Sequence, residues 1–528
     1  MPARHYDVII LGRGIGALLS AAILSRRELR VLLLGQGQLG SRYSVDDHQL
    51  CRRSFSLLSA TSPAFRRALR ELAQTQKFKH LTVPQNPMFA LLDEDIRFDV
   101  PADVEAFGLE VDREFSEIKR LIAELYAEIS TVNAQLDSAF ERDVMWPPGN
   151  LLERLETGRV ASQLPHLGDS SASSRILQHL PEGHRFRQVV ELSALFSSHL
   201  GITPDAVDPL STARLHGSWT RGVHQLAGGE ADLEDFLLAR IQAHGGVVRL
   251  RGRAEEVVTK RGKVVGVIED GEESLTATNH LITDLTGEML AELSGGAGVS
   301  RKAKEAWPHV QTVGGRFVVS AIVDKKGIPR PLPHQSFLSS PGPSLPNISL
   351  QRFEESTFGR SKPVALKPVQ DNCVLVAEML LPQSGGVHVL GAREAVLSTL
   401  RHYLPFLDEH LRLLDSPHDG LPVYRYEKDE SGKNQRREID RVFLSDVSAL
   451  PEPMQARLLI SPMGYLGLAG EPSRGPILGT FLVGQSVLPG FGQEGEVLAA
   501  WSACRIVTRK DRTRQKRRRQ LWSKIETG

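Results

Sequence analysis

The hydrophobic pattern of residues 6–37 changes period twice. Residues 6–11, YDVIIL, form a continuous apolar run, which is typical of a strand buried on both faces of a parallel sheet. A helical pattern follows over about residues 15–25, and RVLLL at residues 30–34 predicts a second buried strand. The order strand, glycine-rich turn, helix, strand is that of the βαβ unit with which a dinucleotide-binding domain begins.

A second periodic stretch predicts one long helix over residues 111–140. Such a stripe of apolar side chains at spacings of three and four indicates a helix that faces a core. The alternative is that the stripe lines an apolar substrate cavity. Its members are Phe115, Ile118, Leu121, Ile122, Leu125, Ile129 and Val132.

Strands and helices alternate again after a polar stretch. Residues 145–190 are rich in Pro, Gly, Ser and His, which favours loops between helical pieces. Residues 232–284 return to α/β order, and further strands are expected within residues 313–330 and 373–382. Many Pro and Ser residues predict loops between these strands, over residues 331–371.

Composition places the chain among globular proteins. Its 528 residues are too many for one ordinary domain, and 41% of them are hydrophobic and 24% charged. No apolar run approaches the roughly 18–20 residues that cross a bilayer, and the first strand leaves no room for a secretory signal. The expected location is therefore cytoplasmic. Cys51, Cys373 and Cys504 lie far apart in the sequence, which indicates isolated thiols rather than disulfides or a metal site.

The net charge of +1 hides a basic C-terminus, RKDRTRQKRRRQLWSK at residues 509–524. Three interpretations stay open: a solvated tail, a tail that binds an anionic membrane surface and inserts Trp522, and a nucleic-acid-binding tail, the least favoured. The second interpretation makes the protein peripheral at the membrane. Removing residues 509–528 is then expected to reduce binding to anionic liposomes.

The turn after the first strand has the GxGxxG/A pattern. In this pattern the first glycine permits the tight turn, the second lets a pyrophosphate approach the backbone, and the third small residue keeps helix and strand close. The helix N-terminus offers its N–H groups to the phosphates. The turn therefore predicts a dinucleotide site formed by Gly12, Gly14, Ile15, Gly16 and Ala17.

A similar arrangement lies at residues 479–507. A strand over residues 480–483 precedes a glycine-rich loop, and a helix is expected to begin near Glu494. The N-terminus of this helix offers backbone donors to an electron-rich group. The alternative is a helix-capping loop without a ligand.

Three segments together resemble the FAD-dependent phytoene desaturase-like oxidoreductases: the glycine turn, GGVVRLRGRAEEVV…GKVVGVIEDGEE, and FLVGQSVLPGFGQEGE near the C-terminus. These belong to the amine oxidase superfamily, which includes the monoamine oxidases and the Rab GDP dissociation inhibitors. The resemblance implies an α/β fold, in which a Rossmann-like FAD/NAD(P)-binding domain is interleaved with an α+β substrate domain. The implied domain order is FAD-binding at residues 1–80, mostly helical substrate domain at 81–215, FAD-binding at 216–300, substrate-domain sheet at 301–455, FAD-binding at 456–507 and basic tail at 508–528.

The resemblance also implies which residues contact FAD. Besides the glycine turn, these are Gly40 and Arg42 in a segment like the family's GGR, the backbone of Val257 on the adenine side, Gly484 and Gln485 at the ribityl and phosphate region, and Gly492, Gln493, Glu494 and Gly495 beside the flavin ring.

Three positions depart from the family's pattern. Gly35 stands where the family carries a Glu that holds the adenosine ribose, Ser41 replaces the second Gly of GGR, and Gln485 replaces a common acidic residue. Gln36 is the candidate to bind the ribose hydroxyls instead, although a neutral amide makes a weaker contact than a carboxylate. FAD is therefore expected to be bound weakly or to have been lost. If the rest of the site is intact, Gly35→Glu is expected to tighten FAD binding.

Two functions follow from the resemblance. The first, an FAD-dependent oxidoreductase that transfers hydride from an apolar substrate such as an isoprenoid to flavin, is favoured. The second is a cofactor-free binding or chaperone protein on the same fold, similar to the Rab GDP dissociation inhibitors. An NADP enzyme is disfavoured because Gln36, rather than an Arg, follows Gly35. No catalytic residue is identified, and His216 and His224 belong to no metal-binding pattern.

Overall fold

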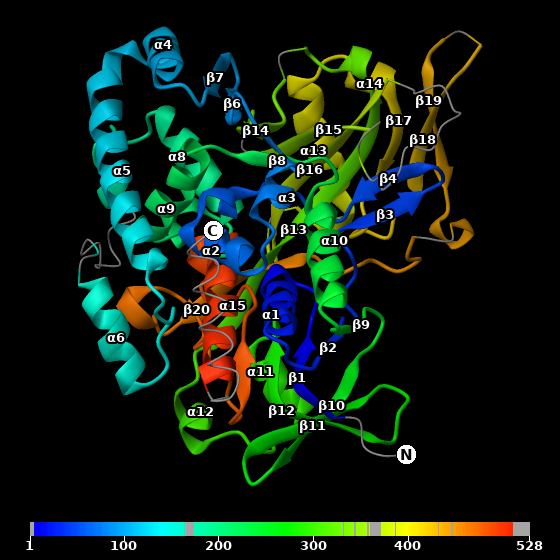
Figure 1. The fold of residues 1–528 in the computed structure, drawn as a ribbon. Helices are drawn as coiled ribbons and strands as arrows, with labels where there is room; N and C mark the ends of the chain where they lie inside the picture. Colours follow the sequence, from blue (N-terminus) through cyan, green and yellow to red (C-terminus); the bar gives the residue numbers. More distant parts are fainter. Residues whose placement is uncertain are drawn as a thin grey trace.

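The computed structural model contains two large sheets and a layer of helices (Figure 1). It describes residues 5–162, 164, 174–330, 332–342, 345–355, 358, 371–385, 387–430, 432–444 and 447–509. The basic tail from residue 510 onward lies outside this range. Among the described helices, none has the length and apolar character needed to span a membrane.

The first sheet brings together strands from both ends and the middle of the chain. Its order is β10-β11-β12-β1-β2-β9, and β21 also pairs with β12. Strands β21, β12, β1, β2 and β9 run parallel, whereas β10 and β11 are antiparallel. The bounds are β1 His5–Leu11, β2 Val31–Leu34, β9 Val247–Arg249, β10 Ala254–Lys260, β11 Lys263–Glu269, β12 Leu275–Thr283 and β21 Thr480–Leu482.

The register of this sheet determines what lies beside the glycine turn. Leu11 at the end of β1 pairs with Thr283 at the end of β12, so Gly12 and Asp284 follow neighbouring parallel strands at one edge. The helices α1 Ile15–Arg26 and α15 Gly492–Arg509 begin at this edge and pack together, and α10 Glu230–Ala243 packs against α1 (Figure 1). The predicted βαβ unit and the predicted C-terminal helix are confirmed.

The second sheet is mostly antiparallel, with the order β19-β18-β17-β13-β16-β15-β14-β6-β7 and β20 beside β13. Its bounds are β6 Phe89–Asp93, β7 Ile96–Val100, β13 His309–Asp324, β14 Gln335–Leu338, β15 Ile348–Glu354, β16 Asn372–Pro382, β17 Leu411–Asp415, β18 Val423–Lys428, β19 Asn434–Ile439 and β20 Gln455–Ser461. Because β20 pairs with β13, this sheet extends beyond residue 455.

Part of the stretch predicted to be loop, residues 331–371, is sheet. β14 and β15 both lie in it, so the prediction was wrong for these residues. β14 pairs with β6 from the N-terminal third of the chain, and β15 pairs with β16. Pairing with other strands, in the case of β14 with one far away in the sequence, fixes these two strands, and the local composition does not reveal it.

The helical layer consists mainly of α4 Val104–Glu114, α5 Lys119–Glu141, α8 Phe186–Ser197 and α9 Pro209–Thr220, grouped on one side of the molecule (Figure 1). The single helix predicted over residues 111–140 is instead two helices, joined at Phe115 and the 3-10 turn η2 Ser116–Ile118. Phe115 leaves the helical conformation, with φ −141° and ψ 37°, and its buried ring packs edge-on against Phe98 and Phe186. This aromatic contact overrides the helical periodicity.

Further strands, helices and 3-10 turns lie between these elements in the sequence. They are β3 Arg42–Val45, β4 His48–Cys51, β5 Thr82–Pro84, β8 His224–Leu226, α2 Pro63–Glu71, α3 Thr75–Lys79, α6 Leu151–Ala161, α7 Ser174–Leu177, α11 Gly287–Leu293, α12 Arg301–Ala306, α13 Val389–Tyr403 and α14 Leu407–His410, with 3-10 turns η1 Leu58–Thr61, η3 Pro204–Ala206, η4 Lys325–Gly327, η5 Arg441–Phe443, η6 Tyr465–Gly467 and η7 Pro489–Phe491. The three cysteines are buried, and no disulfide joins any two of them.

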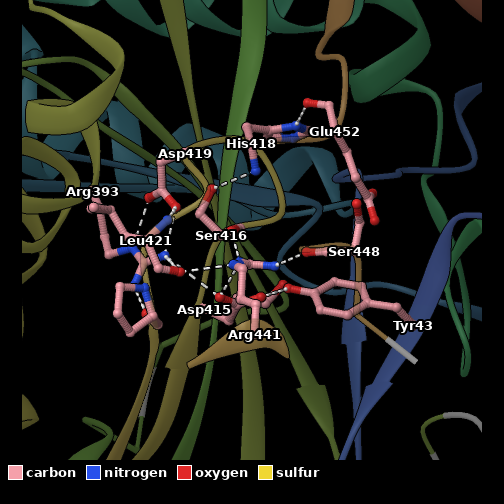
Figure 2. A network of polar contacts seen from close by, with 12 residues as sticks. Tyr43, Arg393, Asp415, Ser416, His418, Asp419, Leu421, Arg441, Ser448 and Glu452 are labelled. Carbon is pink, nitrogen blue, oxygen red and sulfur yellow. Dashed lines mark hydrogen bonds and ion pairs between the residues drawn. The ribbon is translucent and has the colours of Figure 1, made fainter. Parts of the chain in front are cut away.

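A buried polar network ties the β3–β4 hairpin to the second sheet (Figure 2). The Tyr43 hydroxyl donates to Asp415 Oδ2 at 2.8 Å, and Arg441 Nη2 donates to Asp415 Oδ1 at 2.5 Å. Arg393 makes a two-pronged ion pair with Asp419 at 2.7 and 2.8 Å. Because the two carboxylates face two guanidinium groups, this network is internally neutral and is a structural connection between elements.

Candidate functional site

The donors of the glycine turn are bound by a carboxylate of the chain itself. The N–H groups of Gly14 and Arg13 donate to Asp284 Oδ2 at 2.7 and 3.0 Å. Gln38 reaches over the turn, donating to Asp284 Oδ1 at 2.8 Å and accepting from the Arg13 N–H at 2.8 Å. A Cβ added to Gly12 would overlap the Asp284 carboxylate. The space that the glycines leave open is therefore filled by Asp284.

A second carboxylate approaches the same turn from α15. Glu496 Oε2 lies 3.5 Å from the Gly16 nitrogen, and Glu496 Oε1 lies 3.2 Å from His199 Nε2. Burial lowers the pKa of His199, which favours the neutral imidazole. Burial, followed by the charge of Glu496, raises the pKa of Asp284 to about 6, against the hydrogen bonds from Gly14 and Gln38. Asp284 is therefore mostly ionised at pH 7.

The cations near the turn are paired with other acids. The Arg13 guanidinium points to Glu234, at 2.8 Å. Arg53 pairs with Glu230 at 2.7 Å and with Glu234 at 3.1 Å. Arg53 and Glu230 border a small polar cavity of about 110 Å³ that reaches Gly14, and its polar lining also includes His199, Arg316, Gln351, Gln493 and Glu496.

The residues expected near the ribose have other partners. The Gln36 amide donates to the Ala254 carbonyl at 2.8 Å and accepts from the Ala254 N–H at 2.9 Å, so both its groups are bound to backbone. A Cβ on Gly35 would overlap the carbonyl oxygen of Leu250 and lie 2.8 Å from its carbonyl carbon. Gly35 is thus required for close packing of β2 on the segment after β9. This corrects the expectation that Gly35→Glu would restore a contact.

The remaining residues predicted to contact FAD make other contacts within the chain. Gly40 faces the Arg13 guanidinium, and Arg42 pairs with Asp232 at 3.6 Å and Asp235 at 3.3 Å. Val257 is buried in β10 opposite Val267. Ile15 and Ala17 are buried at the start of α1, where the backbone of Val483 comes close to Gly16. Gly484 packs against the Asp284 backbone, and Gln485 accepts from Gln455 at 3.4 Å.

The start of α15 is held by an arginine that sequence reasoning missed. Arg214 of α9, fully buried, donates to Glu494 at 2.5 and 2.6 Å and to Asp137 at 2.8 Å. Although burial opposes the charge, the ion pair with Glu494 raises the Arg214 pKa. Gln493 donates to the Ser56 carbonyl at 2.6 Å, while Gly492 and Gly495 pack against the backbone of Ser197 and Leu488. Glu494 is therefore committed to an internal ion pair.

The turn as it stands does not fit the diphosphate of FAD. A pyrophosphate needs the N–H groups and the glycine space that Asp284 takes, and it would meet the negative charges of Asp284 and Glu496. The adjoining cavity of about 110 Å³ is also below the roughly 300–1,000 Å³ of ordinary small-molecule pockets. The predicted roles of the site residues in FAD binding stay predictions.

Asp284, Glu496 and Gln38 were missed at the level of sequence, although two carried a signal. Asp284 directly follows the buried strand LIT, and the carboxyl ends of parallel strands meet at one edge of a sheet. Glu496 belongs to the first turn and a half of a helix already expected to face the cofactor. No local pattern singled out Gln38.

A much larger cavity, of about 700 Å³, lies along α5. The residues of α5 that line the cavity follow one another at helical spacings of three and four, from Lys119 to Asp137. At a rise of about 1.5 Å per residue, they span about 27 Å of the helix. Ala123, Ala127 and Ala134 leave the space open. Apolar walls come from Phe107 and Val111 of α4, Ile122 and Ile129 of α5, and Met88 and Val100 of the second sheet. The predicted stripe thus faces both the core and an apolar cavity.

Polar groups border this cavity near the C-terminal ends of α5 and α9. Asn133, Asp137, Thr220 and Arg221 line it, and Arg221 donates to Asp137 at 2.7 Å. Through Arg214, Asp137 is connected to Glu494 at the start of α15.

Tyr126, one of the residues that line the cavity, is hydrogen-bonded to a buried histidine. Its hydroxyl lies 2.9 Å from His216 Nε2, and His216 Nδ1 lies 2.8 Å from the Ser193 hydroxyl. Burial lowers the pKa of His216 to about 3, which keeps the imidazole neutral. Ser193 donates to the Val190 carbonyl, so it accepts from Nδ1–H, and Tyr126 then donates to Nε2. His216 is thus a core histidine, and no group of three or more metal-ligating side chains occurs among the described residues.

Comparison with solved structures identifies the fold. A putrescine oxidase variant superposes with a TM-score of 0.58 at 14% identity, covering 97% of this chain and all of that one. An oxidoreductase from Methanosarcina mazei superposes with a TM-score of 0.56 at 16% identity, covering 94% and 99%. The chain has the fold of the FAD-dependent oxidoreductases. The protein PF1083 from Pyrococcus furiosus is similar to the same degree, with a TM-score of 0.55 and 15% identity over 95% and 97%.

The predicted fold class, a Rossmann-like domain interleaved with a second domain, is therefore confirmed. At 14–16% identity these likenesses concern the fold alone. No protein-family model matches the sequence, and a comparison with curated proteins found no match. The phytoene desaturase-like type stays a prediction.

Proposed function

We propose that this protein binds an elongated apolar small molecule in the cavity along α5, on an oxidoreductase fold that does not use flavin. The cavity is the observation that carries the proposal: its volume of about 700 Å³ lies within the range of small-molecule sites. An apolar chain would lie between α4 and α5. The ligand's polar end would face Tyr126, or Asp137 and Arg221.

Binding is favoured over the predicted hydride transfer because of the glycine turn. Both functions need an apolar ligand, but hydride transfer also needs FAD with its diphosphate on the turn. Asp284 already accepts the hydrogen bonds of the N–H groups in the turn, so the turn does not fit the diphosphate. The cofactor-free alternative, similar to the Rab GDP dissociation inhibitors in using the fold for binding, is the function that these contacts support.

Fluorescent analogues test this proposal in a titration of the full chain. We expect saturable binding of a fluorescent long-chain fatty acid or a fluorescent isoprenoid alcohol. The probe with the lower dissociation constant shows which of these two ligand classes the cavity prefers. Ala127→Trp places an indole in the cavity from an exposed position and is expected to weaken binding at least about tenfold, because it fills the space for the chain.

Glu124→Trp is the matched control. Glu124 is exposed on the same helix and does not line the cavity, so its replacement should leave binding unchanged. Equal affinity of Ala127→Trp and the wild-type protein, or the absence of saturable binding by either probe, would contradict the proposal.

A further inference from the structure

We infer that Asp284 and Glu496 act as internal substitutes for the phosphates of a dinucleotide, so that the folded chain excludes FAD from its glycine turn. The inference concerns the turn at the edge of the first sheet. It is independent of what the cavity along α5 binds.

The first step concerns hydrogen bonds. The first turn of a helix has N–H groups without partners inside the helix, and α1 has no side-chain cap of its own at Gly14. In a dinucleotide fold the phosphates accept from these groups. Here Asp284 accepts from Gly14 and Arg13, at 2.7 and 3.0 Å, and Glu496 approaches Gly16. The N–H groups of Arg13 and Gly14, just before α1, thus have an acceptor within the chain, and that of Gly16 faces a second carboxylate.

The second step concerns space. Gly12 and Gly14 have no side chains, and a Cβ at either position would meet the Asp284 carboxylate, in overlap at Gly12 and at 2.9 Å from Oδ2 at Gly14. Gln38 covers the same carboxylate from the other side, through Oδ1. A phosphate could reach these backbone atoms only if Asp284 moved away and gave up three hydrogen bonds.

The third step concerns charge. An incoming diphosphate would lie beside two carboxylates, and the nearby cations are already engaged. Arg13 and Arg53 pair with Glu234, and His199 is neutral and bonded to Glu496. The ribose side adds no compensating contact, because Gln36 is bound to the backbone of Ala254.

The experiment removes both carboxylates and measures FAD binding directly. The wild-type protein is expected to be colourless after purification and to quench no FAD fluorescence in a titration at pH 7.5. The double variant Asp284→Ala/Glu496→Ala opens the turn and removes two negative charges, so we expect FAD affinity to rise at least about tenfold. Inorganic pyrophosphate is expected to raise the melting temperature of the variant only.

Two further variants keep the outcome interpretable. Glu273→Ala removes one exposed carboxylate far from the turn and should leave FAD binding as in wild type. If the double variant does not fold, Asp284→Asn keeps the shape and an acceptor for Gly14 while removing the charge, and it should bind FAD better than wild type.

Two results would overturn the inference. One is wild-type protein that keeps a flavin spectrum through desalting. The other is a folded double variant, or a folded Asp284→Asn, with no gain in FAD or pyrophosphate binding. Failure of the fatty acid and isoprenoid titrations would leave this inference unaffected, whereas flavin retained by the wild-type protein would overturn both this inference and the flavin-free part of the proposed function.

Discussion

Gly35→Ala is expected to destabilise the protein, although the backbone of Gly35 is in a conformation open to any residue. Gly35 is absent from the positions with positive φ, so replacing it by Ala should on conformational grounds gain about 0.4–1 kcal/mol. Steric overlap outweighs this conformational gain. The added methyl would overlap the Leu250 carbonyl oxygen and lie 2.8 Å from the carbonyl carbon, and backbone atoms cannot turn aside as a side chain can.

The size of the effect follows from what must move. To admit the methyl group, the segment after β9 has to shift. Two hydrogen bonds hold this segment: the Gly35 N–H donates to the Arg249 carbonyl oxygen at 3.0 Å, and the Gln36 N–H donates to the Gly252 carbonyl oxygen at 2.9 Å. Two weakened hydrogen bonds cost about 1 kcal/mol each, and overpacking costs about 1–3 kcal/mol. After the conformational gain of about 0.4–1 kcal/mol is subtracted, the free energy of unfolding should fall by about 2–4.5 kcal/mol.

Urea denaturation followed by circular dichroism measures this change. Gly158→Ala in α6 is the matched control, because a Cβ there meets no described atom within 4 Å and alanine favours a helix by up to about 1 kcal/mol. The two Gly→Ala changes should thus have opposite signs. If Gly35→Ala is as stable as the wild-type protein, the close approach of Leu250 is wrong, and Gly35→Glu again becomes a test of the ribose contact.

Three further predictions test the turn, the buried network and the tail. Asp284 holds its proton more tightly in the folded than in the unfolded protein, so its contribution to stability is present below about pH 4 and is lost as the pH rises through about 6. Asp284→Asn should abolish up to about 3 kcal/mol of this decline, measured by urea denaturation at a series of pH values. Glu496, Arg13 and His199, the charged and titratable neighbours, are present in both proteins, and an unchanged pH profile would contradict the prediction. Tyr43→Phe should lower the free energy of unfolding by about 1.5–3 kcal/mol, because it leaves the buried Oδ2 atom of Asp415 without its donor while Oδ1 keeps Arg441. Tyr426→Phe, whose hydroxyl has no hydrogen-bond partner in the described part of the chain, should change it little; equal stabilities of the two variants would refute the role of the network. Removal of residues 509–528 should reduce co-sedimentation with anionic vesicles, since each basic residue near such a surface contributes about 1 kcal/mol, and equal co-sedimentation of both proteins would exclude this role of the tail.

Elements with a strong local pattern were predictable from the sequence. The βαβ unit and α15 have continuous apolar strands, glycine-rich turns and helices that begin directly after them, so neighbouring residues suffice to specify them. β14 and β15 are different, because they are short segments held only by pairing with other strands, and β14 pairs with β6, which is far away in the sequence. The break at Phe115 likewise depends on Phe98 and Phe186, which no helical periodicity includes.

The candidate site shows the same limit at the level of single residues. The glycine turn was found where it lies, but its occupant comes from residue 284, brought there by the pairing of Leu11 with Thr283. Gly35 illustrates the opposite error. Read along the sequence it is a lost ribose contact, whereas in the fold it is the residue that lets β2 approach Leu250. A missing side chain has two explanations, and only the neighbours in space decide between them.

The contacts at the turn also explain how this fold can persist without a cofactor. The N–H groups at the start of α1 need acceptors whether or not a dinucleotide is bound, because a buried donor without a partner costs about 1–3 kcal/mol. A carboxylate placed after β12 meets that need within the chain, and Gln38 in turn satisfies the carboxylate. The raised pKa of Asp284 shows that this arrangement is not optimal for an ionised group: burial and the charge of Glu496 both oppose its ionisation. Asp284→Asn keeps one oxygen that can accept from the turn and loses the charge that keeps phosphates away, whereas its amide nitrogen cannot accept from Gln38. Charge and hydrogen bonding at the turn are therefore separable properties of one side chain.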